Sequence, residues 1–172
     1  MHPLLRDLAG GDARGLGRSA NVVAKVLADG RLFPVLMRGL ESADPLVRMR
    51  AADAAEKITL VRPELLQPYK RKFLRMISTA DRKEIRWHLA QTVPRLDLTK
   101  AERESAFRAI EGYLADSSSI VRTFAMQALV DLAGAFPALM KDAARHVREL
   151  IVTGTPAMRA RGRKLLDKLP PT

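Results

Sequence analysis

Few residues of this chain have the types and spacing that catalysis or metal binding requires. The three histidines are far apart in the sequence: His2, His88 and His146. None has a second histidine one helical turn away, and there is no cysteine, so no metal site is expected. The motif Gly15-x-Gly17-x-x-Ala20 superficially fits a dinucleotide-binding loop, but no strand precedes it and no βαβ pattern surrounds it. We therefore expect no cofactor and no enzymatic activity.

The only tryptophan, Trp87, is a candidate for the floor of a binding groove, because it projects about 200° round its expected helix from the apolar Ile85. Gln91, four residues later, would lie on the same face of the helix. Equivalent positions in the internal repeat described below complete a candidate partner-binding set: Met49, Asp53, Thr123, Gln127 and Lys164. The alternative is that Trp87 packs against a neighbouring helix, since tryptophan is highly buried on average.

A second candidate site is a cluster of basic residues that could bind a polyanion. Its members lie close together in the sequence: Lys70, Arg71, Lys72, Arg75, Arg82, Lys83 and Arg86. The whole chain carries 30 Lys and Arg against 19 Asp and Glu, a formal net charge of +11. Contacts from such a cluster to nucleic-acid phosphates would be independent of base sequence and steeply dependent on salt. The alternative interpretation is a solvated helix face.

The elements that must position these residues repeat along the chain. Apolar pairs four residues apart recur every 37 residues: Leu36 with Leu40, Phe73 with Ile77, Ile110 with Leu114, and Val147 with Ile151. An apolar residue followed by arginine comes after each pair: Val47-Arg48, Ile85-Arg86, Val121-Arg122 and Met158-Arg159. A fixed period of this length indicates stacked supersecondary units, because one unit alone cannot bury its apolar face.

Each period is interpreted as two antiparallel helices, named the A helix and the B helix in chain order. The expected helix pairs cover residues 30–60, 63–96, 99–133 and 137–169, after an irregular leading unit at 1–29. Asp44-Pro45 and Thr155-Pro156 predict the starts of two B helices, because Asp or Thr can cap a helix and proline is pre-set for its first position. Pro94 should kink the second B helix or end it early.

The repeat contains two well-formed motifs: Asp44-Pro45-x-Val47-Arg48-x-x-Ala51-Ala52 and Ser119-x-Val121-Arg122-x-x-Ala125. With the helix pairs, they resemble the HEAT-repeat family of α-solenoids over roughly residues 30–169. The resemblance implies an all-α, right-handed α-α superhelix of four helix pairs, whose concave surface is lined by B helices and binds partners. It also implies a structural arginine ladder between repeats: Arg48, Arg86, Arg122 and Arg159.

A weaker similarity links the chain to the HEAT-like DNA glycosylases that repair alkylated purines. Those enzymes are similar in their helical repeats, their basic groove and a groove tryptophan followed four residues later by aspartate. Here Gln91 stands four residues after Trp87, and an amide cannot carry the anionic role. The nearest acid in the same column of the repeat is Asp53, one repeat away. The similarity therefore implies a related fold without the catalytic aspartate.

Composition fits a folded helical protein, with 47% hydrophobic and 5% aromatic residues. No apolar stretch is long enough for a membrane span, and no secretion signal is apparent, so we expect a single cytoplasmic domain over residues 1–172. The expected function is that of a non-enzymatic scaffold, which binds a protein partner along the concave surface of the B helices. The alternative is a sequence-independent nucleic-acid-binding protein, and the oligomeric state is left open.

Overall fold

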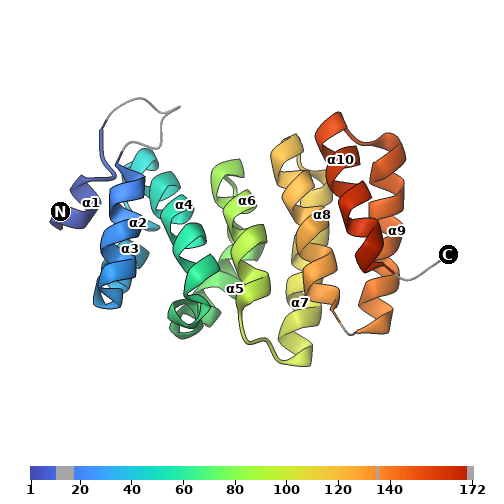
Figure 1. Ribbon diagram of the computed structural model, residues 1–172, viewed down its shortest axis with the longest axis horizontal. Coiled ribbons are helices and arrows are strands. Elements are labelled where there is room, and N and C mark those ends of the chain that lie inside the picture. The colour runs from blue at the N-terminus through green and yellow to red at the C-terminus, as the bar shows by residue number, and fades with distance from the viewer. Residues whose placement is uncertain (11–17, 135, 170–172) are drawn as a thin grey trace. The chain divides into compact units, whose positions relative to one another are not determined.

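The computed structural model describes residues 1–10, 18–134 and 136–169 (Figure 1). Every regular element in these ranges is an α-helix or a short 3-10 helix, and the ranges contain no strand. The prediction of an all-α chain built from successive helix pairs is confirmed. The chain divides into two compact units, Met1–Tyr69 (unit 1) and Lys70–Thr172 (unit 2).

Unit 1 contains the leading unit and the first helix pair. Its elements are α1 Pro3–Arg6, α2 Ser19–Ala28, η1 Gly30–Leu32, α3 Phe33–Gly39, α4 Pro45–Val61 and η2 Pro63–Tyr69. Helix α1 packs on α3, α2 on α4, and α3 on α4. Helix α4 begins as the sequence predicts, because the Asp44 carboxylate accepts the Leu46 N–H at 2.8 Å and Pro45 occupies the first turn.

A buried arginine joins α4 to the start of the chain. Arg50 is only 1% exposed, and its Nη1 donates to the carbonyl oxygens of Leu8 at 2.8 Å and Gly10 at 2.5 Å. Gly10 has a positive φ of 74°, a conformation that suits glycine and turns the chain after α1. Arg50 thus satisfies backbone carbonyls that helix packing leaves without a partner.

Unit 2 contains the remaining three helix pairs. Its elements are α5 Lys70–Thr79, α6 Lys83–Thr92, η3 Val93–Arg95, α7 Lys100–Glu111, η4 Gly112–Ala115, α8 Ser119–Ala133, α9 Pro137–Thr153, α10 Pro156–Leu165 and η5 Leu166–Lys168. The B helices pack in sequence, α6 on α8 and α8 on α10, and the A helix α5 packs on α7 (Figure 1). Helix α8 also packs on α7 and α9, so it lies at the centre of this unit.

The helix ends of unit 2 follow from local sequence. Thr99 and Glu102 form a reciprocal capping box at the start of α7, and the Thr155 hydroxyl accepts the Met158 N–H at 3.4 Å ahead of α10. Helix α6 ends at Thr92, and the next turn is the 3-10 helix that contains Pro94. The expected early end of this helix is therefore confirmed, since proline lacks the N–H that would continue it.

The second expected helix pair, residues 63–96, does not begin as an α-helix. Residues Pro63–Tyr69 form the 3-10 helix η2, because Pro68 within it lacks the N–H group that α-helical bonding requires. Helix α10 ends at Leu165, and η5 follows it.

Candidate binding face of the second helical unit

The candidate residues Trp87 and Gln91 lie on α6, and both side chains are partly exposed. The indole ring is tilted against the buried ring of His88, with centroids 5.4 Å apart. The Gln91 amide donates to the Trp87 carbonyl oxygen at 3.3 Å. Trp87 is therefore partly exposed, and its ring lies against the adjacent residue of its own helix.

On α8, the sequence predicted that Thr123 would be exposed, but the adjacent Phe124 is the more exposed residue. Thr123 is 9% exposed, and its hydroxyl donates to the Ser119 carbonyl oxygen at 2.7 Å. Phe124 is partly exposed, and so is Gln127 three residues later. The spacing of Ile120, Phe124, Gln127 and Asp131 marks one helix face, a signal that the sequence contains but that the repeat register obscured.

Helix α10 adds basic side chains to this face. The Arg161 guanidinium lies 5.6 Å from the centroid of the Phe124 ring and donates to Gln127 Oε1 at 3.2 Å. Gln127 donates in turn to the Asp131 carboxylate at 2.9 and 3.0 Å. Lys168 Nζ lies 3.6 Å from Asp131 Oδ1. These contacts join α8 to α10 and hold Arg161 over an aromatic ring, a favourable cation–π arrangement.

Lys164 completes the basic side of the face. It lies three residues after Arg161 and four before Lys168, so the three share one side of α10 and the turn that follows. Its side chain is exposed. We call the outward side of α6, α8 and α10 the B-helix face of unit 2. It comprises Trp87, Gln91, Ile120, Phe124, Gln127, Asp131, Arg161, Lys164 and Lys168.

The two candidate residues in unit 1 have different surroundings. Asp53 is 8% exposed, and its Oδ2 accepts hydrogen bonds from the Ser19 hydroxyl at 3.0 Å and from Lys57 Nζ at 2.8 Å. The bond from Ser19 ties α4 to α2 within the unit, and the bond from Lys57 lies within α4. Met49 is partly exposed on α4. The arrangement gives Asp53 a structural role in joining α4 to α2.

Two of the repeated arginines make the same contact within their own repeat. Arg48 donates to the carbonyl oxygens of Ser42 at 2.5 Å and Ala43 at 2.9 Å, and Arg86 donates to that of Ala80 at 2.8 Å. In both repeats the arginine reaches back six residues and binds the turn between the A and B helices. This contact was not among the predictions from sequence.

Arg86 also forms the inter-repeat contact that the HEAT resemblance implies. Its Nη1 lies 2.6 Å from Asp116 Oδ2, and its guanidinium lies 5.4 Å from the Tyr113 ring centroid. Burial opposes ionisation of Asp116, but hydrogen bonds from the Ser118 N–H and Arg86 hold the pKa of its carboxyl below the usual value. The other two repeated arginines do not show this contact. The buried Nε of Arg122 has no hydrogen-bond partner, and Arg159 makes no ion pair with any residue that the structure describes.

The basic cluster is partly neutralised within unit 2. Lys70 donates to Glu102 Oε2 and to the Asp97 carbonyl oxygen, both at 2.9 Å, and its bond to Glu102 lowers the pKa of that carboxyl. Arg82 lies 3.9 Å from Asp81. Lys72 is partly buried. The exposed members of the cluster besides Arg82 are Arg71, Arg75 and Lys83. Helix α5 therefore offers fewer available cations than its sequence suggests.

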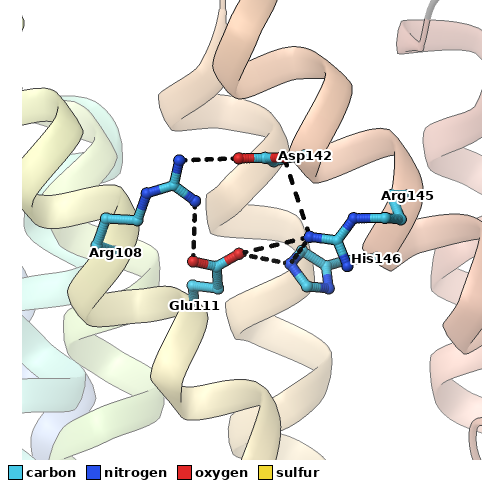
Figure 2. Close-up of polar contacts among 5 residues, drawn as sticks. All are labelled: Arg108, Glu111, Asp142, Arg145 and His146. Carbon is cyan, nitrogen blue, oxygen red and sulfur yellow. Dashed lines mark hydrogen bonds and ion pairs between the residues drawn. The ribbon is translucent and has the colours of Figure 1, made fainter.

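A separate polar network joins the A helices α7 and α9 (Figure 2). Arg108 binds Glu111 at 3.0 Å and Asp142 at 2.8 Å, and His146 Nε2 lies 2.6 Å from Glu111 Oε1. Arg145 lies 3.9 Å from both carboxylates. Burial raises the pKa of Glu111, but the hydrogen bonds from His146 and Arg108 outweigh it and leave the pKa lowered. Each acid faces bases from both helices, which makes the network a clamp between repeats.

Beside this network, an open and largely apolar pocket of about 610 Å³ lies between α7 and the start of α9. Ser105, Phe136 and Leu139 contribute to its lining, with Lys100, Glu104 and Arg108. Over the described ranges, no three potential ligand side chains gather as a metal site would require. Gly15 and Gly17 of the dinucleotide-like motif lie outside the described residues.

Comparison with known proteins shows the fold and no family. No protein-family model matches the chain, and no curated protein matches it in sequence. It is similar to the crystal structure of an engineered protein, with a TM-score of 0.66 and 17% sequence identity over 96% of this chain and 77% of that one. None of the helices in the described ranges is long and apolar enough to cross a membrane. The all-helical architecture thus has a solved counterpart, at an identity that bears on fold alone.

Proposed function

We propose that this protein is a HEAT-like scaffold without catalytic activity, and that it binds a protein partner on the B-helix face of unit 2. The observation that carries the proposal is the pair of partly exposed aromatic rings, Trp87 and Phe124, on neighbouring helices. Each ring has an amide side chain three or four residues later on the same helix, Gln91 and Gln127. Aromatic residues and arginine are enriched in protein interfaces, and they dominate the energetics of binding.

The chemistry of the face favours binding over catalysis. Asp131 on this face accepts hydrogen bonds from Gln127 and lies 3.6 Å from Lys168, so its carboxylate is engaged within the protein. A rigid helical frame holds the side chains in place, which reduces the entropy lost on association. The lack of cysteine in the sequence agrees with a protein that works in the reducing cytoplasm.

Site-specific photo-crosslinking tests this proposal in cells. A photoreactive amino acid is placed at Gln91 or Lys164 on the B-helix face, or at Ser78 or Lys141 on exposed sites of A helices. We expect discrete protein adducts from the first two positions and none above background from the last two. Adducts confined to Ser78 and Lys141 would place the partner surface on the A helices and refute the proposal.

Nucleic-acid binding is the second candidate function, favoured by the net charge of +11 and by the exposed Arg71 and Arg75 on α5. The test is the ratio of absorbance at 260 and 280 nm for protein purified at low salt, measured before and after a high-salt wash. Carried-over nucleic acid that the wash removes would support this candidate. A protein-like ratio before the wash, with no shift of labelled duplex at low salt, would exclude it.

A further inference from the structure

We infer that the partner segment held by the B-helix face of unit 2 is acidic and carries an apolar anchor. The anchor lies over α6 and α8, and the acidic residues lie over α10. This inference rests on the proposed function and adds to it the chemistry and the direction of the bound segment. It follows from the way in which apolar and charged side chains are distributed over three packed helices.

The apolar part of the face lies on α6 and α8. Ile120 is 47% exposed, and Phe124 one turn later is partly exposed. Trp87 lies on α6, which packs directly on α8. An apolar side chain of a partner that covered this part of the face would remove apolar surface from water, which favours binding.

The charged part lies on α10 and the turn after it. Arg161, Lys164 and Lys168 lie on one side of this segment, and Asp131 of α8 is the acid that contacts it. Asp131 is matched by Lys168 at 3.6 Å, which leaves Arg161 and Lys164 in excess. No ion pair to Lys164 occurs among the residues that the structure describes. The excess positive charge is complementary to a segment with two or more carboxylates.

The position of the Arg161 side chain is fixed by contacts with α8, which favours its binding to a carboxylate of the partner. Its guanidinium lies over the Phe124 ring and donates one hydrogen bond to Gln127, which leaves further N–H groups for a partner carboxylate. A guanidinium fixed in this way loses less side-chain entropy on binding than a mobile one. It also links the two parts of the face, because the same side chain touches the apolar ring and belongs to the basic row.

The direction of the segment follows from helix order. Helix α8 lies between α6 and α10, since it packs on both. A segment with its apolar anchor near Trp87 and Ile120 and its acids near Lys164 must therefore cross the B helices. A nucleic-acid strand fits less well, because Arg161 covers the Phe124 ring on which a base would have to stack.

Selection from a random peptide library tests the inference although the natural partner is unidentified. The probe is a phage-displayed library of random peptides about 12 residues long, selected against the whole chain near physiological salt. We expect the recovered peptides to be enriched in Asp and Glu and to share at least one large apolar residue. Binding of the synthesised peptides is then followed by fluorescence of Trp87, the only tryptophan in the chain.

Two matched double variants locate the binding surface. Lys164→Gln with Lys168→Gln removes two cations from the B-helix face, and Arg71→Gln with Arg75→Gln removes two exposed cations from the A helix α5. Both variants change the net charge equally. We expect the first to weaken peptide binding about five- to tenfold, mainly through a slower association rate, and the second to leave it within about twofold. Circular dichroism confirms that both remain folded.

The outcomes separate this inference from the proposed function. Peptides without acidic enrichment, or acidic peptides equally weakened by both variants, would overturn the inference and leave protein binding intact. A selection that yields no binder would count against the proposed function itself. A duplex or single-stranded oligonucleotide that binds more tightly than the peptides, and is weakened by the Lys164 and Lys168 changes, would identify nucleic acid as the occupant and overturn the inference.

Discussion

At the scale of single residues, Arg86 has the most complete set of contacts among the repeated arginines. It binds the Ala80 carbonyl oxygen in its own repeat and the Asp116 carboxylate in the next, and its guanidinium lies over the Tyr113 ring. Tyr113 in turn donates to the Ile77 carbonyl oxygen at 2.7 Å, and burial raises the pKa of its phenol to about 12. A single arginine therefore joins two repeats through three chemically different contacts.

We predict that Arg86→Gln lowers the free energy of unfolding by about 1–3 kcal/mol, because the largely buried Asp116 carboxylate loses its charged partner. Urea denaturation of Arg86→Gln, Asp116→Asn and the double variant measures the coupling between the two side chains. Arg82→Gln serves as the control, since Arg82 is exposed and lies 3.9 Å from Asp81. Additive effects of Arg86→Gln and Asp116→Asn would show that the ion pair contributes nothing.

Asp53, the nearest acid that could replace the glycosylase aspartate, is already hydrogen-bonded within unit 1. Asp53 accepts hydrogen bonds from Ser19 and Lys57 and is almost fully buried in unit 1, whereas Trp87 belongs to unit 2. Loss of one group that stabilises transition-state charge typically costs about 100- to 1,000-fold in rate. The neutral Gln91 therefore argues against base excision at Trp87.

We accordingly predict no release of alkylated bases. The protein is incubated with methylated duplex DNA, and abasic sites are converted to strand breaks by alkali and counted on a gel. Breaks above those of a no-protein sample, abolished by Asp53→Asn, would show that this carboxylate acts in catalysis. Breaks that persist in Asp53→Asn would point to a site built from other residues.

At the scale of elements, two glycines provide a matched test of how tightly the last repeat is packed. A Cβ added at Gly162 of α10 would lie 2.6 Å from Ile151 Cγ1 of α9, whereas a Cβ at Gly112, at the end of α7, meets nothing within 4 Å. We predict that Gly162→Ala is destabilising by about 1 kcal/mol, since overpacking outweighs the gain in helix propensity. Gly112→Ala should stabilise by about 0.5 kcal/mol.

Thermal unfolding of these two variants checks both signs. A lower melting temperature for Gly162→Ala together with a raised one for Gly112→Ala is the expected result. A stabilised Gly162→Ala would mean that α9 and α10 can separate without cost, contrary to the packing that the structure shows.

The clamp between α7 and α9 predicts a pH dependence (Figure 2). In the folded protein the pKa of Glu111 lies below its ordinary value of 4.5. As the pH falls, Glu111 of the unfolded chain therefore takes up a proton before Glu111 of the folded protein does. The contribution of Glu111 to stability is therefore present above about pH 4.5 and is lost as the pH falls through the folded pKa. Arg108, from its own helix, and Asp142, Arg145 and His146, from α9, face this carboxyl.

We predict that Glu111→Gln is less stable than the unmodified chain near neutral pH and that this difference shrinks on acidification. Melting temperatures between about pH 6 and pH 3.5 measure the difference, because the amide has no proton to gain over that range. Glu104→Gln is the control, since the exposed Glu104 lies 4.0 Å from Lys100. A difference that stays constant with pH would mean that Glu111 has an ordinary pKa in the folded protein.

At the scale of the whole molecule, the sequence predicted the helices better than the faces they present. Cap residues and prolines act locally, so Asp44-Pro45 and Pro94 determine helix ends almost regardless of what packs around them. Orientation depends on neighbours that lie one repeat away. On α8 the residue predicted to face outward, Thr123, is buried, whereas the adjacent Phe124 is partly exposed. The period alone does not determine which of two adjacent residues is exposed.

The sequence analysis did not predict the long-range polar contacts, because these too depend on residues about one repeat away. Arg50 reaches the carbonyl oxygens of Leu8 and Gly10 about 40 residues earlier in the chain, and Glu111 meets His146 on the next A helix. Neither contact has a local motif. The pairing of Glu111 with His146 at a separation near one period is a signal that a search for complementary charges between repeats would have found.

Net charge is a property of the whole molecule, and it gives a last prediction. With +11 overall, the protein should bind duplex DNA weakly at about 50 mM salt, without regard to base sequence. Internal ion pairs already neutralise Lys70 and Arg86, so few cations remain for phosphates, and the complex should be lost by about 200 mM salt. Gel shifts over this range, with the Arg71→Gln, Arg75→Gln variant alongside, measure both effects. If the complex persists at 200 mM salt and this variant weakens it, the basic cluster is a dedicated nucleic-acid site, and the second candidate function becomes the leading one.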